Sequence, residues 1–199
     1  AEGATGLDRA LSTWVAAHRS AGLIWLMEGV TVASSSVAIW AVGLACVAGG
    51  FVRRDWRPLQ FVIPTALAAS LATNLMKLAI ARLRPQPPIA LRSFYGYSFP
   101  SGHATTAAAL WGALAVAIVW SGRLRARVAF GVWAVVALMV GTSRIVLGAH
   151  WLTDVAAGTA VGTGIVAAAV LIATPASIPT ALHEEPVPEA EAQPGALRS

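Results

Sequence analysis

Long uncharged apolar runs separated by short polar segments dominate the pattern of this chain. The first run, residues 29–52, has 24 residues, enough to cross a hydrocarbon core of ~30 Å at about 1.5 Å per residue. Further apolar runs, each with at most one acidic or basic residue, cover residues 59–81, 103–121, 128–143 and 152–174. Gly158 and Gly162 are spaced for close helix packing in lipid. The pattern predicts an all-α, integral-membrane helical bundle with about five transmembrane helices in this chain.

The two ends of the chain differ from this bundle. Residues 1–28 place Leu7, Leu11 and Trp14 on one face of a helix that also carries charged residues, which predicts an interfacial amphipathic helix. From residue 175 onward the chain is rich in Pro, Ala and Glu, a composition that cannot bury a core and predicts disorder. We therefore expect an interfacial segment at 1–28, a transmembrane domain at 29–174 and an acidic tail at 175–199.

Composition supports a membrane protein and points to an anionic ligand. The chain of 199 residues is 57% hydrophobic and only 12% charged, which is too apolar for a soluble domain of this length. The net charge of +5 comes mainly from arginine, because Lys77 is the only lysine, and arginine favours recognition of phosphate or carboxylate. The single cysteine, Cys46, excludes a disulfide framework. The expected partners are the bilayer and an anionic lipid, with no nucleic acid; the sequence does not determine the oligomeric state.

Basic loops predict the orientation. The loops 53–57 and 123–127 are rich in arginine and are expected on the cytoplasmic side, so the loop 82–100 is expected outside. The outer ends of the spans nevertheless hold a second group of cations: Lys77, Arg82, Arg84, Arg92 and Arg144. Because a cation near the centre of a membrane helix costs about 2.5–3.5 kcal/mol, we expect an anion to bind this group. For Arg82 and Arg92, contact with lipid headgroups is an equally good explanation.

The stretch from Ser143 to Asp154 concentrates polar chemistry, with Arg144 and His150 between them. If a helix begins near His150, Asp154 lies on the same face four residues later and can accept the Nδ1 proton. That would leave Nε2 free as a nucleophile or base. A His–Asp pair that only caps a buried helix is the alternative.

Two upstream motifs carry similar chemistry. Lys77 and Arg84 are seven residues apart, so they would share one face of a helix that continues through both and could grip one ligand. Farther along, Ser101 is a candidate helix N-cap, and Gly102 leaves the backbone amides bare for a phosphate at the helix N-terminus, with His103 beside it.

Taken together, these motifs resemble those of a known family. In order they are Lys77 with six residues before Arg84-Pro85, then Pro100-Ser101-Gly102-His103, then Ser143-Arg144 with five residues before His150 and three more before Asp154. They resemble the type 2 phosphatidic-acid phosphatase superfamily, which includes membrane lipid phosphatases, soluble acid phosphatases and vanadium haloperoxidases. The match is complete at every motif position. Membrane members usually have six spans, whereas five are expected here.

The resemblance implies a role for each matched residue. His150 would attack phosphorus and form a phosphohistidine, oriented by Asp154, while His103 would protonate the leaving oxygen and later activate water. The phosphoryl oxygens would be held by Lys77, Arg84, Ser101, Gly102 and Arg144. Physics agrees, because phosphoryl transfer depends on charge stabilisation, and a cation ~4 Å from an oxyanion contributes about 4 kcal/mol at an effective dielectric of about 20. No metal and no cofactor are expected, because clustered carboxylates are lacking.

The resulting hypothesis is a phosphatase acting on a lipid phosphate or diphosphate, with undecaprenyl diphosphate as the first substrate, at the outer face of a bacterial cytoplasmic membrane. A phosphatidylglycerophosphate or phosphatidate phosphatase is the alternative, since the cations would recognise the phosphate and not the lipid. A non-catalytic lipid or anion carrier is a rival of another class, but it has no need of His150 paired with Asp154. Five spans argue against a soluble haloperoxidase.

Overall fold

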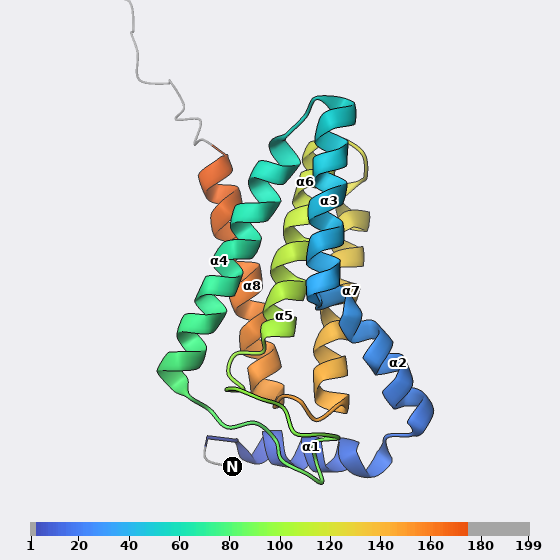
Figure 1. Cartoon of the computed structure of the whole chain (residues 1–199), viewed down its shortest axis with the longest axis vertical. Coiled ribbons are helices and arrows are strands. Elements are labelled where there is room, and N and C mark those ends of the chain that lie inside the picture. The colour runs from blue at the N-terminus through green and yellow to red at the C-terminus, as the bar shows by residue number, and fades with distance from the viewer. Residues whose placement is uncertain (1–2, 175–199) are drawn as a thin grey trace, which may run out of the picture.

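Helices joined by loops make up residues 3–174, the part of the chain that the computed structural model describes (Figure 1). The α-helices are α1 (Gly6–His18), α2 (Ala21–Thr31), α3 (Ser36–Arg53), α4 (Arg57–Ile80), α5 (Gly102–Thr106), α6 (Gly112–Trp120), α7 (Ala126–Val146) and α8 (Leu152–Ala173). A 3₁₀ turn covers Val32–Ser34, and a π-helical turn at Ala107–Trp111 connects α5 to α6. The predicted all-α bundle is confirmed; the tail at 175–199 lies outside the described residues.

Four helical segments are long and apolar enough to cross a membrane: α4, the continuous stretch Gly102–Trp120, α7 and α8. A fifth candidate is a bent pair, in which Ala21–Ser34 and Val37–Arg53 meet at 42°. The expectation of about five spans holds when this pair counts as one. Helix α1 is shorter and lies across the end of the bundle where α7 and α8 meet the loops (Figure 1).

The first span is not the single straight helix that was expected over residues 29–52. The Ser35 hydroxyl donates to the carbonyl of Val32 at 2.7 Å, and serine side chains of this kind compete with helical backbone hydrogen bonds. The indole of Trp111 donates to the carbonyl of Ala33 at 2.7 Å. The break between α2 and α3 therefore has local hydrogen-bond partners, which a non-helical backbone at membrane depth requires.

Close packing between α8 and α5 positions the two helices that begin at the motif residues. A Cβ atom built on Gly158 would lie 2.6 Å from the carbonyl oxygen of Ser101, and one on Gly162 would lie 2.5 Å from that of Thr105. The glycines thus allow the backbones to approach each other, as their spacing predicted. Gly164, two residues farther along α8, has open space instead.

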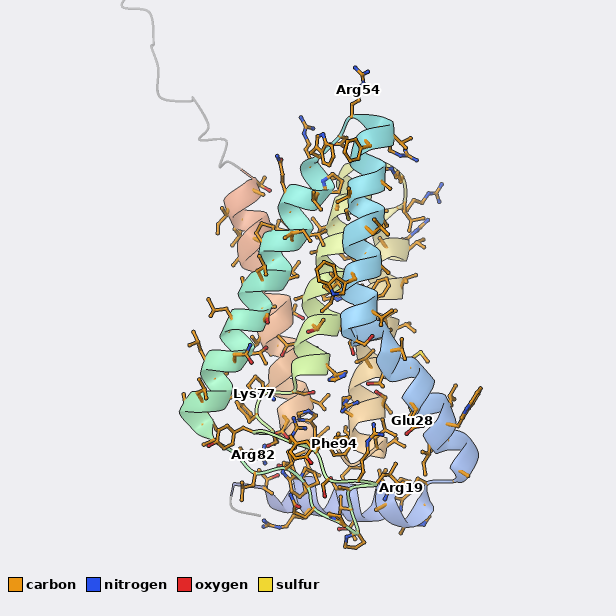
Figure 2. All side chains as sticks on the ribbon, in the orientation of Figure 1. Arg19, Glu28, Arg54, Lys77, Arg82 and Phe94 are labelled. Carbon is orange, nitrogen blue, oxygen red and sulfur yellow. The ribbon has the colours of Figure 1, made fainter. Side chains whose placement is uncertain are left out.

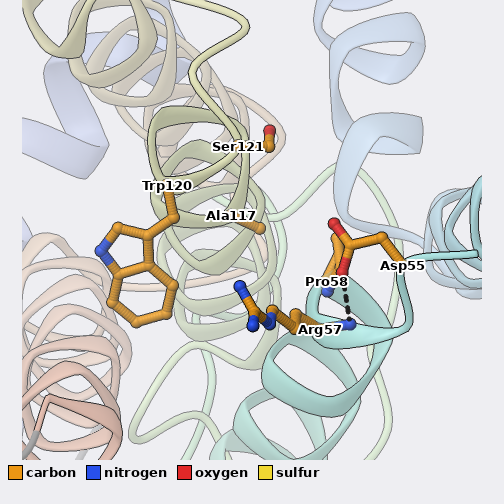
Figure 3. Close-up of a pocket in the computed structure, with 6 residues that line it drawn as sticks. All are labelled: Asp55, Arg57, Pro58, Ala117, Trp120 and Ser121. Atoms are coloured by element: carbon orange, nitrogen blue, oxygen red, sulfur yellow. Dashed lines mark hydrogen bonds between the residues drawn. The ribbon is translucent and has the colours of Figure 1, made fainter. Parts of the chain in front are cut away.

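The opposite end of the bundle carries a small cavity of about 190 Å³ between the start of α4 and the end of α6 (Figure 3). Its lining residues are Asp55, Arg57, Pro58, Ala117, Trp120 and Ser121. The backbone amide of Arg57 donates to Asp55 Oδ1 at 3.2 Å, as the dashed line shows (Figure 3). None of the motif residues lines this cavity, so it is not the candidate active site.

The packing of α8 against α5 can be tested with two glycine substitutions on the same helix. We expect Gly162→Ala to reduce stability by about 1–3 kcal/mol, the usual cost of overpacking a well-packed site. Gly164→Ala should be neutral or should stabilise the helix by up to about 1 kcal/mol. Thermal unfolding of both variants in detergent, followed by circular dichroism, measures the difference. Equal midpoints for the two variants would contradict the close approach.

Candidate active site

The motif residues converge at one end of the bundle, where α4 and α7 end and α5 and α8 begin (Figure 2). Lys77 lies on α4, His103 on α5 and Arg144 on α7, whereas Arg84 and His150 lie in the loops between helices. The imidazole of His103 lies within electrostatic range of the other four side chains. Residues from distant parts of the sequence therefore form one cluster, as predicted.

The contact with Arg84 shows which ring nitrogen of His150 carries the proton. One terminal nitrogen of Arg84 lies 3.0 Å from His150 Nε2, and it also donates to the carbonyl of Ala149 at 2.8 Å. Because a guanidinium has only donors, Nε2 must accept with its lone pair. The proton of a neutral His150 is then on Nδ1.

The Nδ1 side of His150 faces Asp154, as predicted, but not along a helix. The Nδ1 atom lies 3.5 Å from Asp154 Oδ2, within electrostatic contact but longer than an ordinary N–H···O hydrogen bond. Helix α8 begins only at Leu152, so the expected helical spacing of the pair is wrong. Asp154 instead caps α8, because its Oδ2 accepts the backbone amide of Trp151 at 2.9 Å.

The turn that presents His150 depends on Gly148. This residue has φ +64°, and a Cβ there would collide with the backbone of Ile89 and Ala90. Only glycine fits both the left-handed conformation and the close approach. The turn is thereby packed directly against the loop that carries the upstream motif residues.

Lys77 and Arg84 come together without sharing a helix, which corrects the expectation. Helix α4 ends at Ile80, followed by a residue in left-handed conformation. Lys77 Nζ donates to the carbonyl of Tyr97 at 2.7 Å, and Arg84 Nε donates to that of Gly96 at 3.0 Å. Both cations are thus held by carbonyl oxygens of the same loop.

Ser101 is the N-cap of α5, as predicted. Its hydroxyl accepts the backbone amide of Ala104 at 3.4 Å, and its own amide donates to the carbonyl of Asp154 at 3.0 Å. A Cβ on Gly102 would meet only Thr73, at an ordinary contact distance of 3.6 Å. Packing therefore does not require glycine at this position.

Arg144 is buried and faces an aromatic ring that the sequence reasoning missed. Its guanidinium donates to Thr31 Oγ1 at 2.8 Å. The ring of Phe94, in the loop below the helices (Figure 2), has the guanidinium carbons of Arg92, Arg84 and Arg144 at 5.4, 6.0 and 5.8 Å from its centroid. Such contacts are typical cation–π distances. No local pattern marks Phe94, because its three partners come from two different segments.

Arg82 does not reach lipid headgroups, contrary to one of the two explanations considered for it. The side chain is buried, and its terminal nitrogens lie 2.6 Å from Asp154 Oδ1 and 2.7 Å from Asp8 Oδ2. Asp8 was also missed, and its only signal was an acidic residue on the polar face of the N-terminal helix. Within residues 3–174, no three His, Cys, Asp or Glu side chains are grouped as a metal site would require.

Burial sets the charge state of His150. The side chain is only 2% exposed, and burial lowers the pKa of His150 to about 4; contact with Asp154 raises it, while the charges of Arg84 and Arg144 lower it further. At neutral pH the imidazole is therefore uncharged, in agreement with the Arg84 contact. A neutral imidazole whose Nε2 carries a lone pair and no proton can act as a nucleophile.

Comparison with known proteins places this arrangement among phosphatases. A family model described as the PAP2 superfamily matches residues 58–177. Lipid A 1-phosphatase from Rhizobium etli is 36% identical over 111 residues, covering 51% of this chain and 44% of that protein. Phosphatidylglycerophosphatase B from Bacillus subtilis is 29% identical over 160 residues, covering 78% of this chain and 77% of the relative. The chain thus spans less than half the length of the lipid A 1-phosphatase that it matches.

Solved structures have the same fold. A transmembrane PAP2 type phosphatidylglycerolphosphate phosphatase from Bacillus subtilis superposes with a TM-score of 0.75 at 27% identity, covering 82% of each chain. LpxE from Aquifex aeolicus superposes with a TM-score of 0.67 at 18% identity, covering 83% of this chain and 96% of its own. The second likeness concerns the fold alone.

The low pKa of His150 can be measured directly. We expect Nε2 of this residue to stay unprotonated as the pH falls past the ordinary histidine pKa of about 6.5 and to take up a proton only near pH 4. The test is a pH titration of ¹⁵N-histidine-labelled protein by NMR, with the His150 signal assigned from its loss in His150→Gln. Protonation near pH 6.5 would show that burial does not control this imidazole.

Proposed function

The chain belongs to the PAP2 superfamily, and on that premise we propose that it is an integral-membrane phosphatase that hydrolyses a phosphate or diphosphate carried by a lipid. One observation carries the proposal: His150 Nε2 accepts a hydrogen bond from Arg84 inside a cluster of cations at the end of a membrane bundle. The phosphorus of a bound phosphoryl group would lie next to this lone pair, and the nearby cation would contact the phosphoryl oxygens.

The cation cluster supports phosphate binding. Lys77 and Arg84 donate to loop carbonyls at 2.7–3.1 Å, and phosphoryl oxygens can replace those acceptors. A phosphoryl oxygen carries a full negative charge, whereas a carbonyl oxygen carries only a partial one, so the attraction to the two cations favours the phosphate. Arg144, the hydroxyl of Ser101 and the backbone amide of Gly102 complete the proposed clamp.

Catalysis would proceed in two steps. In the first, His150 Nε2 forms a bond to phosphorus while the bond to the leaving oxygen breaks, and His103 donates a proton to that oxygen. Asp154 stabilises the positive charge that appears on the Nδ1–H side of the ring. In the second, His103 takes a proton from water and the water oxygen forms a bond to phosphorus as the bond from phosphorus to His150 Nε2 breaks, which releases inorganic phosphate.

The surface beside the clamp supports a lipid substrate. Helix α4 exposes Leu71, Leu75 and Leu78 next to Lys77, each more than half exposed, and these side chains form one apolar stripe. A lipid tail along this stripe would bring its phosphate to the level of Lys77. The clamp itself contacts only phosphate and does not select the lipid. The names of the relatives therefore decide the order, and they support a phosphatidylglycerophosphate-type substrate ahead of the undecaprenyl diphosphate expected from the sequence.

Phosphate release from a lipid panel tests the function. The purified chain should hydrolyse phosphatidylglycerophosphate, phosphatidate or undecaprenyl diphosphate in detergent, and the substrate with the highest kcat/KM identifies the class. His150→Ala should abolish both turnover and an acid-labile phosphoenzyme. Binding of these lipids without any phosphate release by the wild type would instead support a carrier.

Substitution of His103 should have a different effect on catalysis. His103→Ala should slow the hydrolysis of an alkyl phosphate far more than that of an aryl phosphate, because a weakly basic aryl leaving group has less need of a proton. The range expected for loss of general acid catalysis is about 10²–10⁴-fold for the alkyl substrate. Equal losses for the two substrates would refute the acid role.

We further propose that the site faces the outer side of a bacterial cytoplasmic membrane, because the arginine-rich loops lie at the opposite end of the bundle. In a Cys46→Ala background, Ser93→Cys beside the site should react with a membrane-impermeant thiol reagent added to intact cells. Leu124→Cys, equally a loop position but at the arginine-rich end, should react only after lysis. The reverse labelling pattern would place the site on the cytoplasmic face.

A further inference from the structure

Arg82 lies at the centre of a buried hydrogen-bond cluster that the proposed reaction does not use directly. One terminal nitrogen of Arg82 donates to Asp154 Oδ1 and to Thr153 Oγ1, both at 2.6 Å. The other donates to Asp8 Oδ2 at 2.7 Å. Arg82 is 8% exposed, and both carboxylates are fully buried. A single cation thus joins the N-terminal helix to the carboxylate that faces His150.

Asp8 attaches α1 to the start of α8. Its Oδ1 accepts the backbone amide of Thr153 at 2.9 Å, and its Oδ2 accepts the Thr153 hydroxyl at 2.8 Å. The same carboxylate also accepts the backbone amide of Thr5 and so caps its own helix. Burial opposes ionisation and raises the pKa of Asp8, but these hydrogen bonds and the contact with Arg82 outweigh burial and hold the pKa well below its usual range. Asp8 is therefore a permanent anion in the folded protein.

The cluster leaves Asp154 little freedom. Its Oδ1 is bound by Arg82, and its Oδ2 by the amide of Trp151, so the carboxylate plane is fixed from both sides. A buried carboxylate without a compensating cation is costly and tends to take up a proton. A protonated or rotated Asp154 could not stabilise the Nδ1–H of His150. The state of the nucleophile therefore depends on Arg82.

We propose that Arg82 and Asp8 are positioning residues, which hold Asp154 ionised and oriented toward His150, so that α1 is a working part of the active site. The inference rests on the proposed function, since it assumes that His150 is the nucleophile. Arginine suits this role because its planar fork serves three acceptors at once, whereas lysine offers a single point charge. Neither residue belongs to the proposed phosphate clamp.

Single-turnover kinetics on the chain of 199 residues separate positioning from structural damage. The rate of phosphohistidine formation measures the nucleophile, and its amplitude measures the fraction of folded sites. We expect Arg82→Lys and Asp8→Asn to slow formation about 10–100-fold, the usual range for partners that orient a reactive ligand. Amplitude and KM should stay within about twofold of wild type, because the phosphate clamp is intact. Asp55→Asn removes an acidic side chain at the other end of the bundle and should leave the rate unchanged.

A double variant adds a specific test. Arg82→Gln leaves two buried carboxylates without their cation and should be slower than Asp8→Asn. Adding Asp8→Asn to Arg82→Gln removes one of those charges, so the double variant should react faster than Arg82→Gln alone. Wild-type rates in Arg82→Lys and Asp8→Asn, or reduced amplitudes at wild-type rates, would overturn the positioning role. Absence of a phosphohistidine in the wild type would refute the proposed function instead, and this inference with it.

Discussion

Positive charges crowded at one end of an apolar bundle repel each other and lose hydration, so each needs acceptors from the protein. In this chain the loop after α4 supplies them: carbonyl oxygens of Tyr97 and Gly96 accept from Lys77 and Arg84. A helix could not offer those carbonyls, because its own amides would occupy them. Residues 81–101 therefore do more than connect two spans, because their non-helical backbone leaves carbonyl oxygens free to accept from the cations.

The same constraint connects the two halves of the site. The carbonyl of Asp154 accepts the amide of Ser101, so α5 and α8 begin at a common point, and Gly158 and Gly162 let the two helices stay in contact beyond it. The histidines that belong to these two segments consequently have a defined separation. A site for phosphoryl transfer needs that rigidity, because small displacements of reacting groups have large effects on rate.

Periodicity and local motifs were sufficient to predict the four spans after residue 56, the N-cap at Ser101 and the convergence of Lys77, Arg84, His103, Arg144 and His150. They failed where a distant partner decides the local structure. The course of the chain after Ile80 and the burial of Arg82 both depend on acceptors more than ten residues away, and for Arg82 on Asp8 and Asp154, which lie 74 and 72 residues away. The break between α2 and α3 was missed for another reason: serines in an apolar run carry no charge and do not interrupt a hydropathy pattern.

The contact between Asp8 and Thr153 spans 145 residues, almost the whole described chain, and this has a consequence for biosynthesis. Asp8 leaves the ribosome 145 residues before Thr153, which enters the membrane with α8. Until then α1 has no partner on α8 and Arg82 has only one of its two carboxylates. The cluster is therefore completed only after α8 has been inserted, and a chain that lacks α8 would have its cations in place without an organised nucleophile.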